Sequence, residues 1–210
     1  MSVGDVFDAV TEQHVVAIVR TKNQEEGFET ARSLIAAGLR AIEVSLTTPG
    51  ATEILRSLSG SIPAGVAIGA GTVLSLKDVD LAYGSGARYV VTPNFDETVV
   101  RAAARRGMIG IVGCGSVSEA VRASASGATF IKLFPASQWT PMAMSDVLAA
   151  LPLLRFVPTG GVRVDDAATW IFAGAAAVGL GRSLSNLAAD PPAIRLLLRV
   201  LEQAAAKGEL

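Results

Sequence analysis

The chain alternates short β-branched runs with longer alanine-rich segments of helical period, and this repeat restricts the possible folds more than any other feature. Strands that are apolar on both faces and separated by single helices form a parallel sheet through right-handed crossovers. Eight runs have the composition of such strands: Val15–Val19, Ala41–Leu46, Val66–Ile68, Tyr89–Val91, Ile109–Val112, Phe130–Leu133, Phe156–Val157 and Ala177–Leu180. Eight units in 210 residues predict an α/β protein with one domain, residues 1–210, folded as a (β/α)8 TIM barrel.

The helices of this barrel are predicted from the segments between the strands. Five of them are followed by a glycine suited to a left-handed C-cap: Gln24–Ala37 by Gly38, Ser75–Tyr83 by Gly84, Glu97–Arg106 by Gly107, Val117–Ser126 by Gly127 and Asp165–Ala173 by Gly174. We expect an extra N-terminal helix at Val3–Gln13 and a terminal helix at Pro192–Lys207. A doubly wound open sheet is the alternative, because periodicity does not show whether the sheet closes.

Composition excludes several classes of function. A formal net charge of -1 without a basic cluster provides no footprint for nucleic acid. Apolar runs break well before the roughly 20 residues that span a bilayer, so we expect no membrane partner and, without a visible secretory signal, a cytoplasmic protein. One cysteine excludes an internal disulfide, and one histidine with one cysteine argues against a zinc site of the usual His/Cys type. We therefore expect no metal and no cofactor, with Cys114 a small buried side chain instead of a nucleophile.

Lys132 lies near the end of the run Phe130–Leu133, where a buried strand would carry hydrocarbon. Burial of an ammonium group disfavours its charged form, so a lysine here is expected to be neutral, paired or chemically used. Glu43 lies in Ala41–Leu46, and strand alternation puts it on the same face as Ala41 and Ser45. A neutral amine beside a carboxyl group suits iminium chemistry, in which the amine adds to a ketone and the carboxyl group moves protons.

Polar residues follow nearly every predicted strand, at the end of a parallel barrel where active sites lie. The candidate substrate-binding residues at these ends are Arg20, Thr47, Thr72, Pro93, Phe134, Thr159, Gly160, Gly161, Gly181 and Ser183. The glycine-rich ends of strands seven and eight expose backbone N–H groups and predict a phosphate site, to which Thr159 and Ser183 add hydroxyl groups. Arg182 either pairs with that phosphate or points to solvent.

These residues together resemble the 2-keto-3-deoxy-6-phosphogluconate (KDPG) aldolase family and its phosphogalactonate-cleaving (KDPGal) relatives over almost the whole chain. The most specific segments are 42–44, 68–73, 91–94, 131–136 and 158–162. The resemblance implies that Lys132 forms a Schiff base with pyruvate and that Glu43 is the acid/base. It further implies that Thr72 holds the pyruvate carboxylate, that Phe134 packs near the pyruvyl group and that the strand-seven and strand-eight loops bind phosphate. It also implies a homotrimer.

The resemblance leaves the substrate open. Many gluconate-type members carry an arginine where this chain has Thr47, and galactonate-type members also lack that arginine. Thr159 instead resembles the gluconate type. Arg20 is a candidate for the missing cation, and its charge would depress the pKa of Lys132.

Two other function classes remain. One is a phosphate-binding barrel isomerase or synthase, which shares the loop glycines but needs no buried lysine. The other is a non-catalytic sugar-phosphate-binding barrel, in which Lys132 only contacts an anion. The resemblance favours cleavage of a 2-keto-3-deoxy-6-phospho sugar acid to pyruvate and glyceraldehyde 3-phosphate, with 4-hydroxy-2-oxoglutarate as a further candidate substrate.

Overall fold

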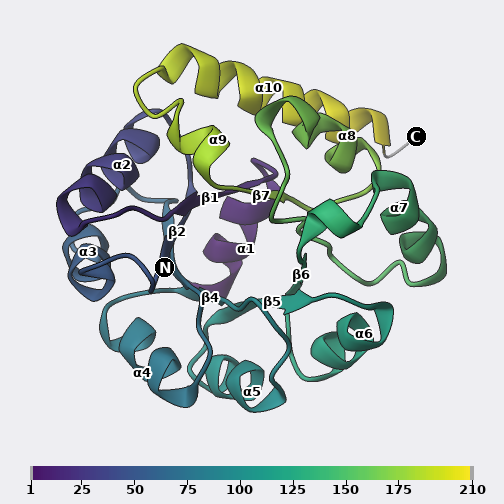
Figure 1. The fold of residues 1–210 in the computed structure, drawn as a ribbon, viewed down its shortest axis with the longest axis horizontal. Helices are drawn as coiled ribbons and strands as arrows, with labels where there is room; N and C mark the ends of the chain where they lie inside the picture. The colour runs from purple at the N-terminus through teal and green to yellow at the C-terminus, as the bar shows by residue number, and fades with distance from the viewer. Residues whose placement is uncertain (1, 209–210) are drawn as a thin grey trace.

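A seven-stranded parallel sheet, curled and surrounded by helices, forms the centre of the molecule (Figure 1). The computed structural model describes residues 2–208. Its strands are β1 (Val15–Val19), β2 (Ala41–Ser45), β3 (Ala67–Gly71), β4 (Tyr89–Val91), β5 (Ile109–Cys114), β6 (Phe130–Leu133) and β7 (Val178–Leu180). They lie in the order β6-β5-β4-β3-β2-β1-β7, so neighbours in sequence are neighbours in space except where β7 returns to β1. The repeat therefore predicted the parallel sheet correctly.

The helices of the fold are α1 (Val3–Thr11), α2 (Gln24–Ala36), α3 (Ala51–Ser59), α4 (Leu76–Gly84), α5 (Glu97–Arg105), α6 (Val117–Ala125), α7 (Pro141–Ala150), α8 (Ala167–Phe172), α9 (Arg182–Ser185) and α10 (Pro191–Gly208), with two 3-10 turns at Ala136–Gln138 and Val164–Asp166. Helices α2 to α8 connect successive strands on the outside of the sheet, α1 precedes β1, and α9 and α10 follow β7. Among the residues described, none of these helices combines the length and apolar character that a membrane span requires.

Most helix ends follow from local chemistry. Side chains cap the N-termini of several helices by accepting a backbone N–H bond, as Asn23 does for α2 and Ser116 for α6. Gly38, Gly107, Gly127 and Gly174 have positive φ angles, as predicted. The prediction for Gly84 was wrong, because α4 includes that residue and the left-handed turn follows at Gly86, with φ of 89°.

The segment predicted as a strand at Phe156–Val157 is present between β6 and β7 but makes only isolated bridges, Ile131 to Phe156 and Thr159 to Gly179. Its backbone alternates hydrogen bonds with β6, including the Val157 N–H to the Ile131 carbonyl at 2.8 Å. On its other side, the Gly179 N–H donates to the Pro158 carbonyl at 2.9 Å. Proline has no N–H, so Pro158 interrupts a regular ladder and the segment is not a continuous strand.

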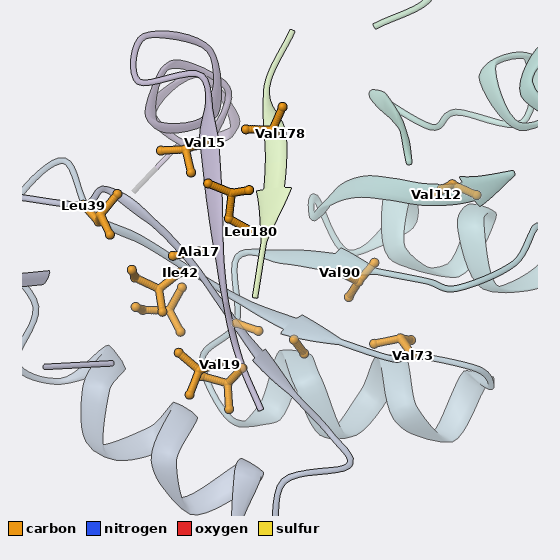
Figure 2. Close-up of a cluster of buried hydrophobic side chains, with 14 of the residues drawn as sticks. Val15, Ala17, Val19, Leu39, Ile42, Val73, Val90, Val112, Val178 and Leu180 are labelled. Carbon is orange, nitrogen blue, oxygen red and sulfur yellow. The ribbon is translucent and has the colours of Figure 1, made fainter. Parts of the chain in front are cut away.

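The two faces of the curled sheet contain different hydrophobic clusters. The outer cluster packs the sheet against the helices, and Figure 2 shows its valine, leucine and isoleucine side chains on β1, β2, β4, β5 and β7. The inner cluster includes Ala41, Tyr89, Val91, Ile109 and Phe130. On β2, Ile42 and Val44 belong to the outer cluster, whereas Ala41 belongs to the inner one. Glu43 therefore faces inward, as strand alternation predicted.

Helix α1 closes the inner face at the end where the strands begin. It contacts β1, β2, β3 and β5 and lies across the middle of the molecule in Figure 1. Its residues Val6, Ala9 and Val10 belong to the inner cluster, and Phe7 stacks on Phe130 with 5.4 Å between ring centroids. The open side of the fold is therefore the one where the strands end.

Glycines on the inner face make room for neighbouring groups. A Cβ at Gly113 on β5 would overlap the Pro93 backbone, which lies in the loop after β4. The Thr92 hydroxyl fixes that loop, because it accepts the Gly113 N–H at 3.0 Å and donates to the Asn94 carbonyl at 2.7 Å. Gly113 thus allows the Pro93 loop to approach the strand next to β6.

We expect Gly113→Ala to lower the free energy of unfolding by about 1 to 3 kcal/mol, since the added methyl group must displace backbone. Gly110→Ala is the matched control in the same strand, because its methyl group would meet the Val112 side chain at 3.4 Å and the Ala128 Cα at 3.9 Å, without overlap. Urea denaturation of both variants measures the difference. Equal stability of the two variants would contradict the close packing at Gly113.

Candidate active site

Lys132 is buried on the inner face of β6, one residue before the strand ends. Its side chain is 6% exposed, and the ε-amino nitrogen lies 4.8 Å from the centroid of the Phe134 ring. Register pairs it with Gly113 of β5, the residue that lies against the Pro93 loop. The structure therefore brings Lys132, Phe134 and Pro93 together at the open end of the sheet.

Glu43 is the buried carboxyl group of the same inner face, with 2% of the residue exposed. A Cβ at Gly71 would overlap its carboxylate, so the side chain of Glu43 crosses β3 toward the open end. Among the described residues, neither Glu43 nor Lys132 forms an ion pair within 4.0 Å. Their charges interact through the protein interior without direct contact, which leaves the amine free to react.

Burial shifts both groups toward their neutral forms. Desolvation lowers the pKa of Lys132, opposed by the charge of Glu43 and assisted by the charge of Arg20. Desolvation also raises the pKa of Glu43, opposed by the charges of Lys132 and Arg20. Both directions favour an uncharged amine beside a protonated carboxyl group, which is the combination that adds to a carbonyl and then donates a proton.

Hydroxyl groups and one guanidinium group form a network beside this pair. The Ser45 hydroxyl lies 2.8 Å from that of Thr47 and 2.9 Å from that of Thr72. Arg20 donates to Ser45 at 3.4 Å and to Thr72 at 3.3 Å. Thr72 has a φ of 62°, a conformation rare for a β-branched residue and one that recurs at functional sites.

Ser45 is the member of this network that the candidate list from the sequence omitted. It is fully buried and lies two residues after Glu43, on the same face. The only feature of the sequence that pointed to Ser45 was strand alternation, which places it on the same face as Glu43. The structure otherwise joins Arg20, Thr47 and Thr72 as expected from their places at strand ends.

The two glycine-rich loops lie next to each other, because Thr159 and Gly179 form a bridge just before them. Gly160 and Gly161 have φ angles of 85° and 96°, and their N–H groups find no acceptor in residues 2–208. Gly181 and Ser183 begin the short helix α9 in the neighbouring loop. This arrangement offers several N–H donors to one anion.

Thr159 differs in position from the other candidates for the phosphate site. It is buried, and its hydroxyl donates to the Val157 carbonyl at 3.1 Å. A Cβ at Gly179 would overlap this hydroxyl, so the Thr159 side chain fills the inner face below the loops. The Thr159 hydroxyl is therefore not directed at the anion site. Thr159 would contribute to that site only through the backbone of the loop that begins at this residue.

Cys114 is excluded as a nucleophile by its surroundings. It is buried in the outer cluster, and burial, with a smaller effect from Glu119, raises the pKa of its thiol to about 12. The part of the chain that the structure describes contains no group of three or more His, Cys, Asp or Glu residues placed to hold a metal ion.

A cavity of about 320 Å³ lies beside Gly161, between Trp139, Asp166 and Trp170, and Lys132 and Glu43 do not line it.

Residues 6–190 match the family model described as KDPG and KHG aldolase. The chain is 36% identical over 174 residues to a probable 2-dehydro-3-deoxy-6-phosphogalactonate aldolase from Rhizobium meliloti, with 82% of each chain covered. It is 34% identical over 167 residues to a 2-dehydro-3-deoxy-phosphogluconate aldolase from Treponema pallidum, with 79% of each chain covered.

A solved structure with a similar fold is the KDPG aldolase from Legionella pneumophila, with pyruvate captured as a covalent carbinolamine intermediate. The TM-score is 0.78 and the identity 25%, with 97% of this chain and 98% of that chain covered. The similarity therefore extends over the whole curled sheet and its helices.

The charges around Lys132 predict how its reactivity depends on pH. Only the neutral amine is acetylated, so the midpoint of Lys132 acetylation against pH follows its pKa. Because Glu43 raises this pKa and Arg20 lowers it, Glu43→Gln should move the midpoint down and Arg20→Gln should move it up. Competitive acetylation with peptide mass spectrometry measures the midpoint.

The exposed Arg56 on α3 provides the control, since Arg56→Gln removes the same charge far from the strand ends. This variant should leave the Lys132 midpoint in place. An upward movement in Glu43→Gln would contradict the assigned electrostatics.

Proposed function

The chain belongs to the KDPG and KHG aldolase family, and from this membership we propose that it is a Schiff-base (class I) aldolase, a lyase. Its substrate is a 2-keto-3-deoxy-6-phospho sugar acid, cleaved to pyruvate and glyceraldehyde 3-phosphate. The observation that carries this proposal is a buried lysine whose pKa is lowered by desolvation, on the same inner face as a buried glutamate whose pKa is raised.

The reaction begins at the ketone carbon of the substrate. The neutral Lys132 amine adds to that carbon to form a carbinolamine, and the Glu43 carboxyl group donates a proton to the hydroxyl group that leaves as water. The product of this step is an iminium ion on Lys132. The Legionella relative, captured as a carbinolamine with pyruvate, supports the same first step here.

The bond between C3 and C4 then breaks. Glu43, now a carboxylate, accepts the proton of the C4 hydroxyl, and the bonding electrons move into the iminium to form an enamine while the aldehyde leaves. Protonation of the enamine at C3 restores the iminium. Hydrolysis then releases pyruvate and returns Lys132 to its neutral form.

The substrate carboxylate is proposed to bind at Arg20 and Thr72, with Ser45 and Thr47 completing the hydroxyl network. Pro93 and Phe134 would flank the three-carbon portion that becomes pyruvate. These residues surround the open end near Lys132, and Arg20 is the one whose charge acts on both Lys132 and Glu43.

The substrate phosphate is proposed to bind at Gly160, Gly161, Gly181 and Ser183, in the loop that Thr159 starts and the loop beside it. The free N–H groups of the two positive-φ glycines support this role. A Cβ at Gly160 would lie 2.9 Å from the Phe134 ring, so the absence of a side chain at Gly160 leaves room for that ring. Relatives named for the galactonate and the gluconate substrate are 36% and 34% identical to the chain, so both C4 epimers are candidate substrates.

We propose that the sheet closes into a single-domain (β/α)8 barrel, in which residues 155–159 form the additional strand between β6 and β7 and α1 is an additional helix. Hydrogen bonds on both sides of this segment support closure, and the ring of helices in Figure 1 has the corresponding arrangement. A barrel explains why all candidate residues meet at one end.

We propose a homotrimer in solution. Large apolar side chains are exposed at Met142 on α7, Leu153 after it, Phe172 on α8 and Leu196 on α10, and α8 and α10 contact each other. Exposed apolar surface of this kind supports an interface between copies of the chain. The cytoplasmic location expected from the sequence stays a prediction.

Incubation with pyruvate and borohydride should add pyruvate covalently to Lys132 and inactivate the enzyme, because reduction of an iminium gives a stable amine. Peptide mass spectrometry locates the adduct, and a coupled assay with both C4-epimeric phosphorylated substrates measures cleavage. Lys77 on α4 is the internal control, since this exposed lysine should remain unmodified. Labelling elsewhere, or none, would leave the isomerase and binding-protein alternatives.

Glu43→Gln should lower kcat by about 10²- to 10⁴-fold, because the amide keeps the size of the side chain but transfers no proton. KM should change far less, since Glu43 does not hold the substrate. Steady-state kinetics on the better of the two epimers measures both constants. Turnover within a few-fold of the unmodified enzyme would show that Glu43 is only structural.

A further inference from the structure

Tyr89 is a fully buried residue of the inner cluster that the proposed chemistry does not use. Its hydroxyl makes no hydrogen bond to any of residues 2–208. Buried hydroxyl groups nearly always have a partner, because leaving one without a partner costs free energy. An apolar phenylalanine would fill the same space without that cost, so the position of this hydroxyl requires an explanation.

The backbone register places the Tyr89 ring beside Glu43. Gly69 on β3 pairs with Tyr89 on β4 and with Glu43 on β2, so it stands between them. A Cβ at Gly69 would overlap the Tyr89 ring at Cδ2, Cε2 and Cζ. The ring therefore crosses β3 over Gly69, and its hydroxyl end is directed toward β2 at the level of Glu43.

The Glu43 carboxylate lies further along the same inner face, toward the ends of the strands. It occupies the space over Gly71, the next inward residue of β3 after Gly69. Two residues along a strand span roughly 7 Å, and one water molecule between two hydrogen-bonding groups spans most of that distance. The groups with charge or protons that face Glu43 are thus Lys132 from β6, Arg20 from the end of β1 and Tyr89 from β4.

We propose that Tyr89 is a positioning residue for Glu43: its hydroxyl donates a hydrogen bond to the Glu43 carboxylate, directly or through one water molecule, in the covalent complex. The hydrogen bond stabilises the carboxylate at the stage when it must accept the C4 hydroxyl proton. This inference rests on the proposed aldolase function and assigns a task to a residue outside the reacting pair.

The protonation state of Tyr89 fits a donor. Burial, and then the charge of Glu43, raise the pKa of the phenol well above its ordinary value. A raised pKa favours the protonated phenol, which is the form that donates a hydrogen bond.

Tyr89→Phe tests the proposal because it removes the hydroxyl and keeps the ring. Without its donor, the Glu43 carboxylate should be harder to form, so the acidic limb of the kcat profile should move up by about half to one pH unit. At neutral pH kcat should fall by about 3- to 10-fold, with KM nearly unchanged. Tyr83→Phe is the matched control, since Tyr83 is the other tyrosine of the chain and is 52% exposed on α4.

A second variant shifts the profile in the opposite direction. In Tyr83→Phe protein, 3-fluorotyrosine can be incorporated at Tyr89 alone, and its more acidic phenol is a stronger donor. The acidic limb should then move to lower pH. In a Glu43→Gln background, Tyr89→Phe should cause no further loss, because the group that it positions is already inactive.

The outcomes separate this inference from the proposed function. If the unmodified enzyme cleaves its substrate and is trapped at Lys132, but Tyr89→Phe leaves the pH profile unchanged, the role of Tyr89 is refuted and the aldolase function stands. Higher thermal stability of Tyr89→Phe with an unchanged profile would identify the hydroxyl as merely an unpaired buried group. Absence of cleavage and of trapping in the unmodified enzyme would refute both.

Discussion

The limited space inside the curled sheet determines how the rest of the site is arranged. A parallel sheet curled this tightly cannot hold a large side chain at every inward position, so long side chains alternate with glycines. Glu43 lies over Gly71, Tyr89 over Gly69 and Thr159 over Gly179. Each inward side chain has therefore one direction in which to extend, and the site is positioned by packing before any substrate binds.

The same packing accounts for the electrostatics. Removing an amine and a carboxyl group from water costs on the order of several kcal/mol per ion, and this cost favours their neutral forms. Arg20 lies at the exposed edge of the site, where its own charge remains hydrated, and still acts on both groups. The depth of Lys132 in the fold, together with one cation near the surface, thus lowers the pKa of its amine.

The sequence predicted the parts of the structure that depend on local pattern. The bounds of β1, β4 and β6 were predicted exactly as observed, and alternation placed Glu43 on the inner face. Strand ends identified Arg20, Thr47 and Thr72 as neighbours. These features repeat at short range, so a single sequence contains the information for them.

Features that depend on distant contacts were not predicted. The interruption at Pro158, the inward position of the Thr159 hydroxyl and the partnership of Tyr89 with Gly69 each involve a neighbouring strand that local pattern does not specify. Ser45 was placed on the correct face but not in the site, because its hydrogen bonds reach Thr72 on another strand end. Register between strands, and not the character of any one strand, decides these contacts.

The position of helix α1 bears on the order in which the two products of the proposed reaction would leave. Since α1 covers the end of the inner face where the strands begin, molecules reach Lys132 from the opposite end. Lys132 is buried and the glycine loops are partly exposed, so a fragment attached to Lys132 would lie deeper than a fragment held at the loops. The phosphorylated aldehyde would therefore diffuse away first, and pyruvate would leave last. Pyruvate would then compete with new substrate for the empty site. The aldehyde would bind productively only to enzyme that already carries the enamine.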